Sequence, residues 1–451
     1  MKILRLSLVL VLLAGKFLMA APAIEGLVLA ENVLPQLEPV LTAAAQQSPS
    51  MLNRALDLEI AENNRIQARA GLLPSLGGYA NYLQSRDTRA DLVGRVEVTK
   101  IAYNFSINQP VFYWGERLNA LKASEIQASI AKGQYQEGYR ALAQILRDSY
   151  MRLIAQKLGV KRWAAYADFT KNQLAKEEIR LAQKVIADAQ IVPVRLAAEQ
   201  GQLTYERVQF DFEMAKLSFA RLSGLPPLSD NEIPDSIPTL GYAAGTYDRL
   251  LAGFLAQKEL PAIEAVTMRQ QLESAGLTLA TDKTRLRPKF SLVLGISQDE
   301  QSYTINVAQK YRVNSVFGGI SVNWTVFDGL ASRAAVRSDL ARLRQMKTDY
   351  KVLNDRLAQQ AQTNVRQINF AARNMVINDR SLLSIESNLK SKQEDFARGT
   401  SSEDDVNLAR IAVYDAQINA IGARCDFLNR VGEFLGTIMA DPVLENVAVV
   451  K

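Results

Sequence analysis

The chain carries the same arrangement twice: a strand-like stretch that leads directly into a very long run without proline. In 101–112 the residues alternate, so that Ile101 and Phe105 point to one side and Asn104 and Ser106 to the other. A period of two gives a strand one apolar and one polar face. This stretch therefore predicts a strand between an apolar phase and water or a polar lumen.

The second copy begins about 215 residues further on. In 316–327, Ile320 and Val322 alternate with Ser321 and Asn323, and the next proline is far downstream. Matched patterns at a fixed offset indicate an internal repeat. The repeat covers most of the chain, so the fold must place a strand before a long helix twice.

The pattern divides the chain into five parts. We expect a signal peptide (1–23), a first repeat (24–225), a proline-rich connector (226–250), a second repeat (251–436) and a short tail (437–451). The first repeat is expected to hold a helix over 51–73, strands over about 76–84 and 101–112, and long helices over 115–223. The second is expected to hold a helix from about 263, strands over about 290–298 and 315–327, and long helices over 330–435, with polar loops before the second strand of each copy.

The long runs carry apolar residues seven apart, as in Leu196, Leu203, Phe210 and Leu217. Such rows are typical of helices that pack in coiled-coil style. A core stripe in an ordinary helical bundle is the alternative. A single helix over 115–183 would be on the order of 100 Å long, however, which is too long for a compact domain. The predicted fold is therefore mainly α, an elongated rod or tube with four strands.

Composition argues against an enzyme. The chain has 451 residues, no histidine and one cysteine, Cys425. Histidine is the commonest general base and metal ligand, and a lone cysteine permits no internal disulfide or thiolate cluster. No nucleophile–base pair or phosphate-binding loop is present. We expect no catalytic residues, no metal site and no cofactor.

The first 23 residues resemble an export signal. Lys2 and Arg5 precede a short apolar core, and small residues follow around Ala20. A retained N-terminal anchor is the alternative, although the apolar run is too short to span a bilayer. Removal of this segment lowers the basic residues from 53 to 50 against 47 acidic ones, so nothing indicates a nucleic-acid partner.

Four features together resemble the TolC-like family of outer-membrane efflux and secretion channels. The first is a helix–proline–strand element around Pro74 and Pro288. The second is the strand–helix junction 108–117, with its counterpart at 324–330, and the third is the helix turn 399–409. The two-copy layout is the fourth. Any one of these is weak, but the set in this order is specific.

The resemblance implies a homotrimer in which each chain gives four strands to a 12-stranded β-barrel and its helices form an α-barrel tunnel. The expected location is the outer membrane of a Gram-negative bacterium, in contact with its lipid. The expected function is the exit duct of a tripartite efflux or type I secretion system. Its partners would be a periplasmic adaptor and an inner-membrane pump of the RND, ABC or MFS type.

The resemblance also places a gate at the helix turn of the second repeat. Asp405 matches the family position whose acidic side chains form a ring, and Asp404 and Glu403 add to it if they face inward. Gly399, Ser401 and Ser402 form the turn itself. The alternative is that these acids favour the start of a helix that a serine caps. In the first repeat Asp188 is a candidate lumen acid, or an ordinary solvated residue.

The junction residues are the remaining candidates. They comprise Pro110, Phe112, Trp114 and Gly115 in the first copy, Phe327 and Gly329 in the second, and Pro74 and Pro288 between helix and strand. Aromatic residues at strand ends are typical of the girdles of membrane barrels. For Trp114, packing between barrel and tunnel is an alternative.

One other class of protein also fits the heptads: a secreted coiled-coil tether without a pore. It leaves the four alternating strands at matched positions unexplained. The cargo does not follow from the sequence, although the lack of histidine disfavours metal-ion export.

Overall fold

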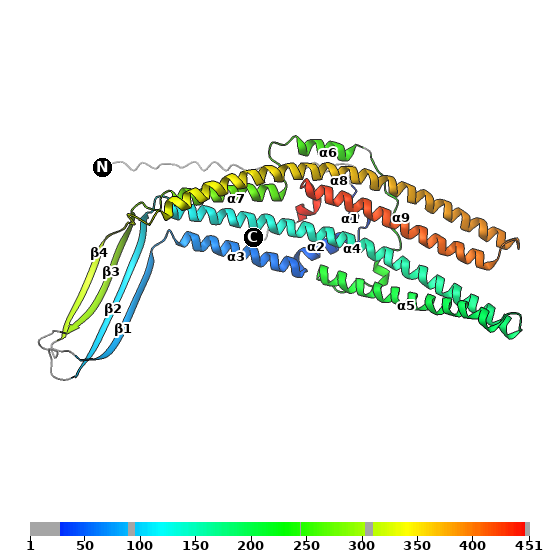
Figure 1. Cartoon of the computed structure of the whole chain (residues 1–451), viewed down its shortest axis with the longest axis horizontal. Coiled ribbons are helices and arrows are strands. Elements are labelled where there is room, and N and C mark those ends of the chain that lie inside the picture. Colours follow the sequence, from blue (N-terminus) through cyan, green and yellow to red (C-terminus); the bar gives the residue numbers. More distant parts are fainter. Residues whose placement is uncertain (1–27, 89–94, 244, 303–309, 447–451) are drawn as a thin grey trace, which may run out of the picture.

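The chain forms an elongated body of long helices with a four-stranded sheet at one end (Figure 1). The computed structural model describes residues 28–88, 95–243, 245–302 and 310–446. The first half holds α1 (Ala30–Val33), α2 (Leu37–Gln47), α3 (Pro49–Ala70), β1 (Ser75–Thr88), β2 (Arg95–Phe112), α4 (Glu116–Ala182) and α5 (Asp188–Ser223). It is followed by η1 (Asp230–Glu232), α6 (Thr246–Leu255), α7 (Ile263–Asp282), β3 (Lys289–Ser302), β4 (Lys310–Asn323), α8 (Ala331–Ala397), α9 (Glu403–Thr437) and η2 (Pro442–Asn446).

The two longest helices have the same length. α4 and α8 each contain 67 residues, which corresponds to about 100 Å at 1.5 Å per residue. Each is entered through two consecutive residues in the left-handed region, Trp114 and Gly115 before α4 and Gly329 and Leu330 before α8. These paired turns redirect the chain from the sheet into the helix at equivalent places of the two copies.

The sheet is antiparallel throughout, in the order β1-β2-β3-β4. Gly78 lies so close to Phe105 of the neighbouring strand that an added Cβ would stand 2.3 Å from the ring. Pro110 has no N–H to donate to the ladder, and the register between β2 and β3 shifts between Pro110 and Phe112. Within the described residues, β1 and β4 each pair on one side only, so both are edge strands.

The strand predictions were right in number and order but wrong in extent. β1 and β3 run past the predicted ends at 84 and 298, and β2 and β4 begin before 101 and 315, so that most of the expected loop 298–312 is strand. Polar and charged residues continue the ladder there because their backbone groups still pair across the hairpin. Residues 324–327, predicted as strand, lie outside β4 because the chain is already turning toward α8.

The helices form a wall one helix thick. α4 packs against α3 and α7 near the sheet and against α5 and α9 further away, while α8 packs against α7 and then α9. The order across the wall is therefore α3-α4-α7-α8 in one half and α5-α4-α9-α8 in the other. α3 and α5 form one edge of the wall, and α8 forms the other.

A belt of short elements lies across the middle of the wall. We use this name for α1, α2, residues 225–243 with η1, α6 and η2. Here the main hydrophobic core lies, with buried residues from both chain ends and from α4, α8 and α9, among them Leu37, Leu146, Ile368, Phe427 and Phe434. Sequence analysis did not predict α1, α2 or α6, because each is too short for a clear period. Where one repeat ends and the next begins stays a prediction, and the expected signal peptide lies outside the described residues.

Candidate functional site

The turn between α8 and α9 is built around a capping box. Gly399 adopts a left-handed conformation, with φ of 77°, and α9 begins at Glu403. The Ser402 hydroxyl accepts a bond from the Asp405 backbone N–H (3.1 Å), and the Asp405 carboxylate accepts one from the Ser402 N–H (3.0 Å). The hydroxyls of Ser402 and Ser401 also donate to this carboxylate, at 2.7 and 3.1 Å. Bonds from the side chain and backbone of Ser402 lower the pKa of Asp405.

Asp404 links the hairpin of α8 and α9 to the hairpin of α4 and α5. Its carboxylate accepts a bond from the Lys176 ammonium of α4 at 2.7 Å. This bond, with a second from Gln173, lowers the pKa of Asp404. Lys176 is accordingly stabilised as a cation, and its pKa is raised. The pair fixes the end of α9 beside α4.

Glu403 differs from the other two acidic residues of this turn in its contacts. It is the first residue of α9 and is exposed. Within the described chain its carboxylate makes no hydrogen bond or ion pair, whereas both neighbouring aspartates do. A free carboxylate here is stabilised by the positive end of the helix dipole and stays available to an ion in solution.

The turn between α4 and α5 has the same backbone with different side chains. Lys184 takes the left-handed conformation that Gly399 takes in the second turn. The Ala187 N–H donates to the Gln190 side chain at 3.0 Å, as the Ser402 N–H does to Asp405. Asp188 is the first residue of α5 and therefore corresponds to Glu403. Lys184 stands where the second turn has Gly399, so no glycine marks this turn in the sequence.

Each strand–helix junction contains a tryptophan, Trp114 in the first copy and Trp324 in the second. The Trp114 indole donates to the Pro288 carbonyl at 2.8 Å, and the Trp324 indole donates to the Leu286 carbonyl at 3.0 Å. The Phe112 ring lies edge-on to Trp114, and the Arg287 guanidinium covers the face of Trp114. Both indoles thus hold the short segment that leads from α7 into β3.

The other junction candidates lie where helix and strand meet. Pro74 and Pro288 immediately precede β1 and β3, Pro110 lies at the β2 irregularity, Gly115 and Gly329 take left-handed conformations, and Phe327 is exposed between β4 and α8. Trp114 is half-buried by these contacts, which agrees with packing at the junction. A girdle role for the junction aromatics stays a prediction.

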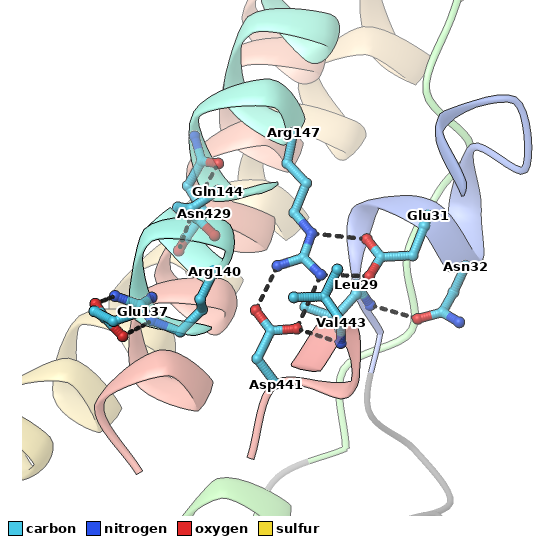
Figure 2. Close-up of polar contacts among 10 residues, drawn as sticks. All are labelled: Leu29, Glu31, Asn32, Glu137, Arg140, Gln144, Arg147, Asn429, Asp441 and Val443. Carbon is cyan, nitrogen blue, oxygen red and sulfur yellow. Dashed lines mark hydrogen bonds and ion pairs between the residues drawn. The ribbon is translucent and has the colours of Figure 1, made fainter. Parts of the chain in front are cut away.

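A buried ionic cluster at the belt was missed by sequence analysis. Arg147, in the middle of α4, reaches Glu31 of α1 and Asp441 near the C-terminus, with nitrogen–oxygen distances of 2.5–3.0 Å (Figure 2). The Arg147 side chain is 2% exposed and that of Asp441 is 0% exposed. Burial disfavours the charged guanidinium, but the bonds to both carboxylates outweigh it and raise the pKa of Arg147. No local motif marks this cluster, because its members lie at the two ends and the middle of the chain.

Two properties of the described part of the chain bear on function. None of its helices is both long and apolar enough to cross a lipid bilayer. None of its groups of cysteine, aspartate or glutamate side chains is arranged to hold a metal ion.

One family model matches part of the chain. Residues 40–160 match the family model described as outer membrane efflux protein. No curated protein matches the chain by sequence.

Solved structures share the fold over nearly the whole chain. The CmeC outer membrane channel of Campylobacter jejuni matches with a TM-score of 0.68 and 12% identity, covering 92% of this chain and 90% of its own. The open state of the Neisseria gonorrhoeae MtrE outer membrane channel matches at 0.62 and 14%, covering 90% and 89%. The outer membrane protein VceC of Vibrio cholerae matches at 0.62 and 14%, covering 90% and 97%. The predicted fold class, mainly α with four strands, is confirmed.

Proposed function

We propose that three copies of this chain close into an exit duct that carries solutes from an inner-membrane pump across the periplasm and the outer membrane. The observation that carries the proposal is the placement of the free edges. β1, α3 and α5 form one side of the molecule, and β4 and α8 form the other. Strand edge and helix edge therefore lie on the same two sides, and a neighbouring copy can complete both at once.

The sheet edges call for such a neighbour. β1 and β4 are 14 residues long each, and a long free edge strand leaves backbone N–H and C=O groups unpaired. In lipid this is costly, and only a closed barrel satisfies every group. Apolar side chains on one face of the sheet, among them Leu294, Ile296 and Val316, are exposed and suit contact with outer-membrane lipid.

The helix edges carry matching apolar rows. On α5, Leu203, Phe210 and Leu217 are about half exposed or more, and on α8 so are Phe370 and Ile377. Phe210 lies about 33 Å from the start of α5 and Ile377 about 30 Å from the end of α8, at 1.5 Å per residue. Leu217 and Phe370 stand at about 44 and 41 Å by the same measure. The rows therefore reach the same levels above the two turns, as an interface between neighbouring copies requires.

The contact is between two different surfaces, which gives a ring if the rotation closes. Four strands are too few for a membrane barrel, whereas three copies give the even number 12 that the family resemblance implies. The trimer then has a helical tunnel about 100 Å long below the barrel. A periplasmic adaptor and an inner-membrane pump are the partners that such a tunnel needs at its far end.

In this assembly the second turn narrows the tunnel, and its acids form a negative ring. Lys176 neutralises Asp404, so the net charge of the ring comes from Asp405, which also caps α9, and from Glu403, which has no bonding partner among the described residues. Carboxylates from three copies around a narrow axis favour cations over anions. The cargo itself is selected by the pump and is not fixed by this chain.

Single-channel recording in planar bilayers tests the duct. The detergent-extracted trimer is expected to give stable, cation-preferring currents. Glu403→Gln is expected to lower the cation preference, and Asp188→Asn shows whether the corresponding acid of the first turn contributes to it. A protein that is soluble without detergent, not trimeric and without conductance would instead be a coiled-coil tether.

A further inference from the structure

The turn that leads from α7 into β3 is strongly basic. Residues 283–289, which we call the basic turn, contain four cations and no acidic residue: Lys283, Arg285, Arg287 and Lys289. The corresponding turn of the first copy, residues 69–75, contains one cation, Arg69, and also no acidic residue. Both turns lead from a helix through a proline into a strand, so the fold of the turn does not require the additional cations.

The backbone of the basic turn is fixed, whereas its basic residues point into solvent. The Trp324 indole donates to the Leu286 carbonyl and the Trp114 indole to the Pro288 carbonyl, so two hydrogen bonds hold neighbouring positions of the turn. Three of the four basic residues are exposed, namely Lys283, Arg285 and Arg287. A ligand that binds these side chains does not have to order the backbone, which lowers the entropic cost of binding.

These three exposed residues form no ion pair within the part of the chain that the structure describes. The fourth, Lys289, pairs with Glu116 at 2.5 Å. Bonds from the hydroxyl and N–H of Ser332 lower the pKa of Asp328, and the charge of Arg285 contributes less to this shift. The Asp328 carboxylate is thus already bound by Ser332. Three positive charges per chain therefore remain available to an anion at the basic turn.

Arg287 lies at the rim of the apolar face of the sheet. Its guanidinium carbon is 4.6 Å from the centre of the Trp114 ring, and Trp114 lies edge-on to Phe112 with ring centres 4.7 Å apart. Phe112 pairs with Phe290 across the ladder, and Phe290 shares a face with Leu294 because the two are four residues apart in one strand. In the proposed duct this face contacts lipid, so Arg287 lies at the periplasmic surface of the bilayer, where tryptophan and basic side chains are favoured.

We propose that the basic turn binds the phosphate group of an anionic phospholipid in the leaflet of the outer membrane that faces the periplasm. This proposal rests on the proposed duct. The acyl chains would lie on the apolar face beside Phe112 and Phe290, and the phosphate beside Arg285 and Arg287. A guanidinium can bind a phosphate through two parallel N–H bonds while it stacks on an aromatic ring, as Arg287 does on Trp114. Because the first copy lacks these cations, a trimer would hold three such lipids and not six.

Lipid binding to the purified trimer tests this site. The trimer in detergent is titrated with dioleoyl phosphatidylglycerol, and the bound lipids are counted by native mass spectrometry. Dioleoyl phosphatidylethanolamine has the same acyl chains and a phosphate but no net charge, and serves as the control lipid. The variant Arg285→Gln/Arg287→Gln removes two cations from the basic turn. The matched control, Arg344→Gln/Lys347→Gln, removes two exposed cations of α8 that lie about 20–24 Å along the helix from its start at the sheet.

We expect three tightly bound phosphatidylglycerol molecules per wild-type trimer and weaker binding of phosphatidylethanolamine. Each cation near a membrane surface strengthens the binding of anionic lipid about 5-fold. Arg285→Gln/Arg287→Gln is therefore expected to weaken binding about 25-fold, and the control variant less than about 2-fold. Each single substitution, with an expected loss of about 5-fold, keeps the test possible if the double variant does not assemble.

Three results would overturn the inference while the proposed duct stands. The first is equal binding of the two lipids, and the second is an equal loss, or no loss, in the two double variants. The third is displacement of the lipid by inorganic phosphate at the same concentration, which would make free phosphate the ligand. A wild-type sample that is not trimeric before lipid is added overturns the proposed function itself.

Discussion

The two halves of this molecule share a backbone and differ in what surrounds it. α4 and α8 have the same length, begin after the same pair of left-handed residues and end in turns of the same conformation. α4 lies inside the wall and under the belt, whereas α8 forms an edge. A duplicated chain can therefore keep its backbone and assign core contacts to one copy and intersubunit contacts to the other.

The middle of the two helices gives the largest expected difference. Arg147 and Gln362 are both residue 32 of their helices, but Arg147 is buried between two carboxylates and Gln362 is exposed. Arg147→Met leaves Glu31 and Asp441 without a cation and is expected to cost about 3–5 kcal/mol. Gln362→Met is expected to change stability by less than about 0.5 kcal/mol. Denaturant unfolding of both variants checks this, and equal losses would show that the belt does not depend on the cluster.

The turn backbones give the next difference. Nothing lies within 4 Å of a Cβ added at Gly399, so Gly399→Ala adds only the strain of a left-handed residue, about 1 kcal/mol. Lys184 already bears that strain, and Lys184→Gly is expected to relieve about 0.5–1 kcal/mol. Thermal unfolding measures both shifts. Changes of the same sign would contradict the equivalence of the two turns.

The residues that cap α5 and α9 make the same hydrogen bond but differ in charge. Gln190 does in the first turn what Asp405 does in the second, so the cap needs an oxygen acceptor and no charge. Asp405→Asn is expected to keep the stability of the protein and to lower the cation preference of the channel, whereas Asp405→Ala lowers both. If neither variant alters the reversal potential in a salt gradient, Asp405 is a helix cap alone.

The smallest expected effect is that of the Lys176–Asp404 pair, which has no counterpart among the described contacts of the first turn. The lowered pKa of Asp404 means that the pair's stabilisation is present above the ordinary aspartate range and is lost as the pH falls through the lowered pKa. The raised pKa of Lys176 means that it is also lost at strongly alkaline pH. Because the pair is solvent-screened, Lys176→Met is expected to cost at most about 0.5 kcal/mol at pH 7 and less at a pH below the lowered pKa of Asp404. A loss that is the same at both pH values would exclude the ion pair as its cause.

Sequence patterns with a period predicted most of this fold, because each periodic stretch carries its own signal. The strands around Phe105 and Leu294 and the long helices follow directly from such patterns. The belt does not, since α1, α2 and α6 are short and its ionic cluster joins Glu31, Arg147 and Asp441 across the chain. In the turn between α8 and α9, the family resemblance pointed to the acidic residues. Only the geometry shows that Asp404 and Asp405 are bonded, whereas Glu403 has no partner among the described residues.

The most direct test of the account is a cross-link between the two edges that it joins. Phe210→Cys and Ile377→Cys in one Cys425→Ser chain place a thiol on each edge at the same level. Oxidation is expected to link three chains covalently on a denaturing gel, while each single variant stays monomeric there. Linked pairs from a single variant, or no link with both thiols present in a folded protein, would contradict a ring closed through α5 and α8.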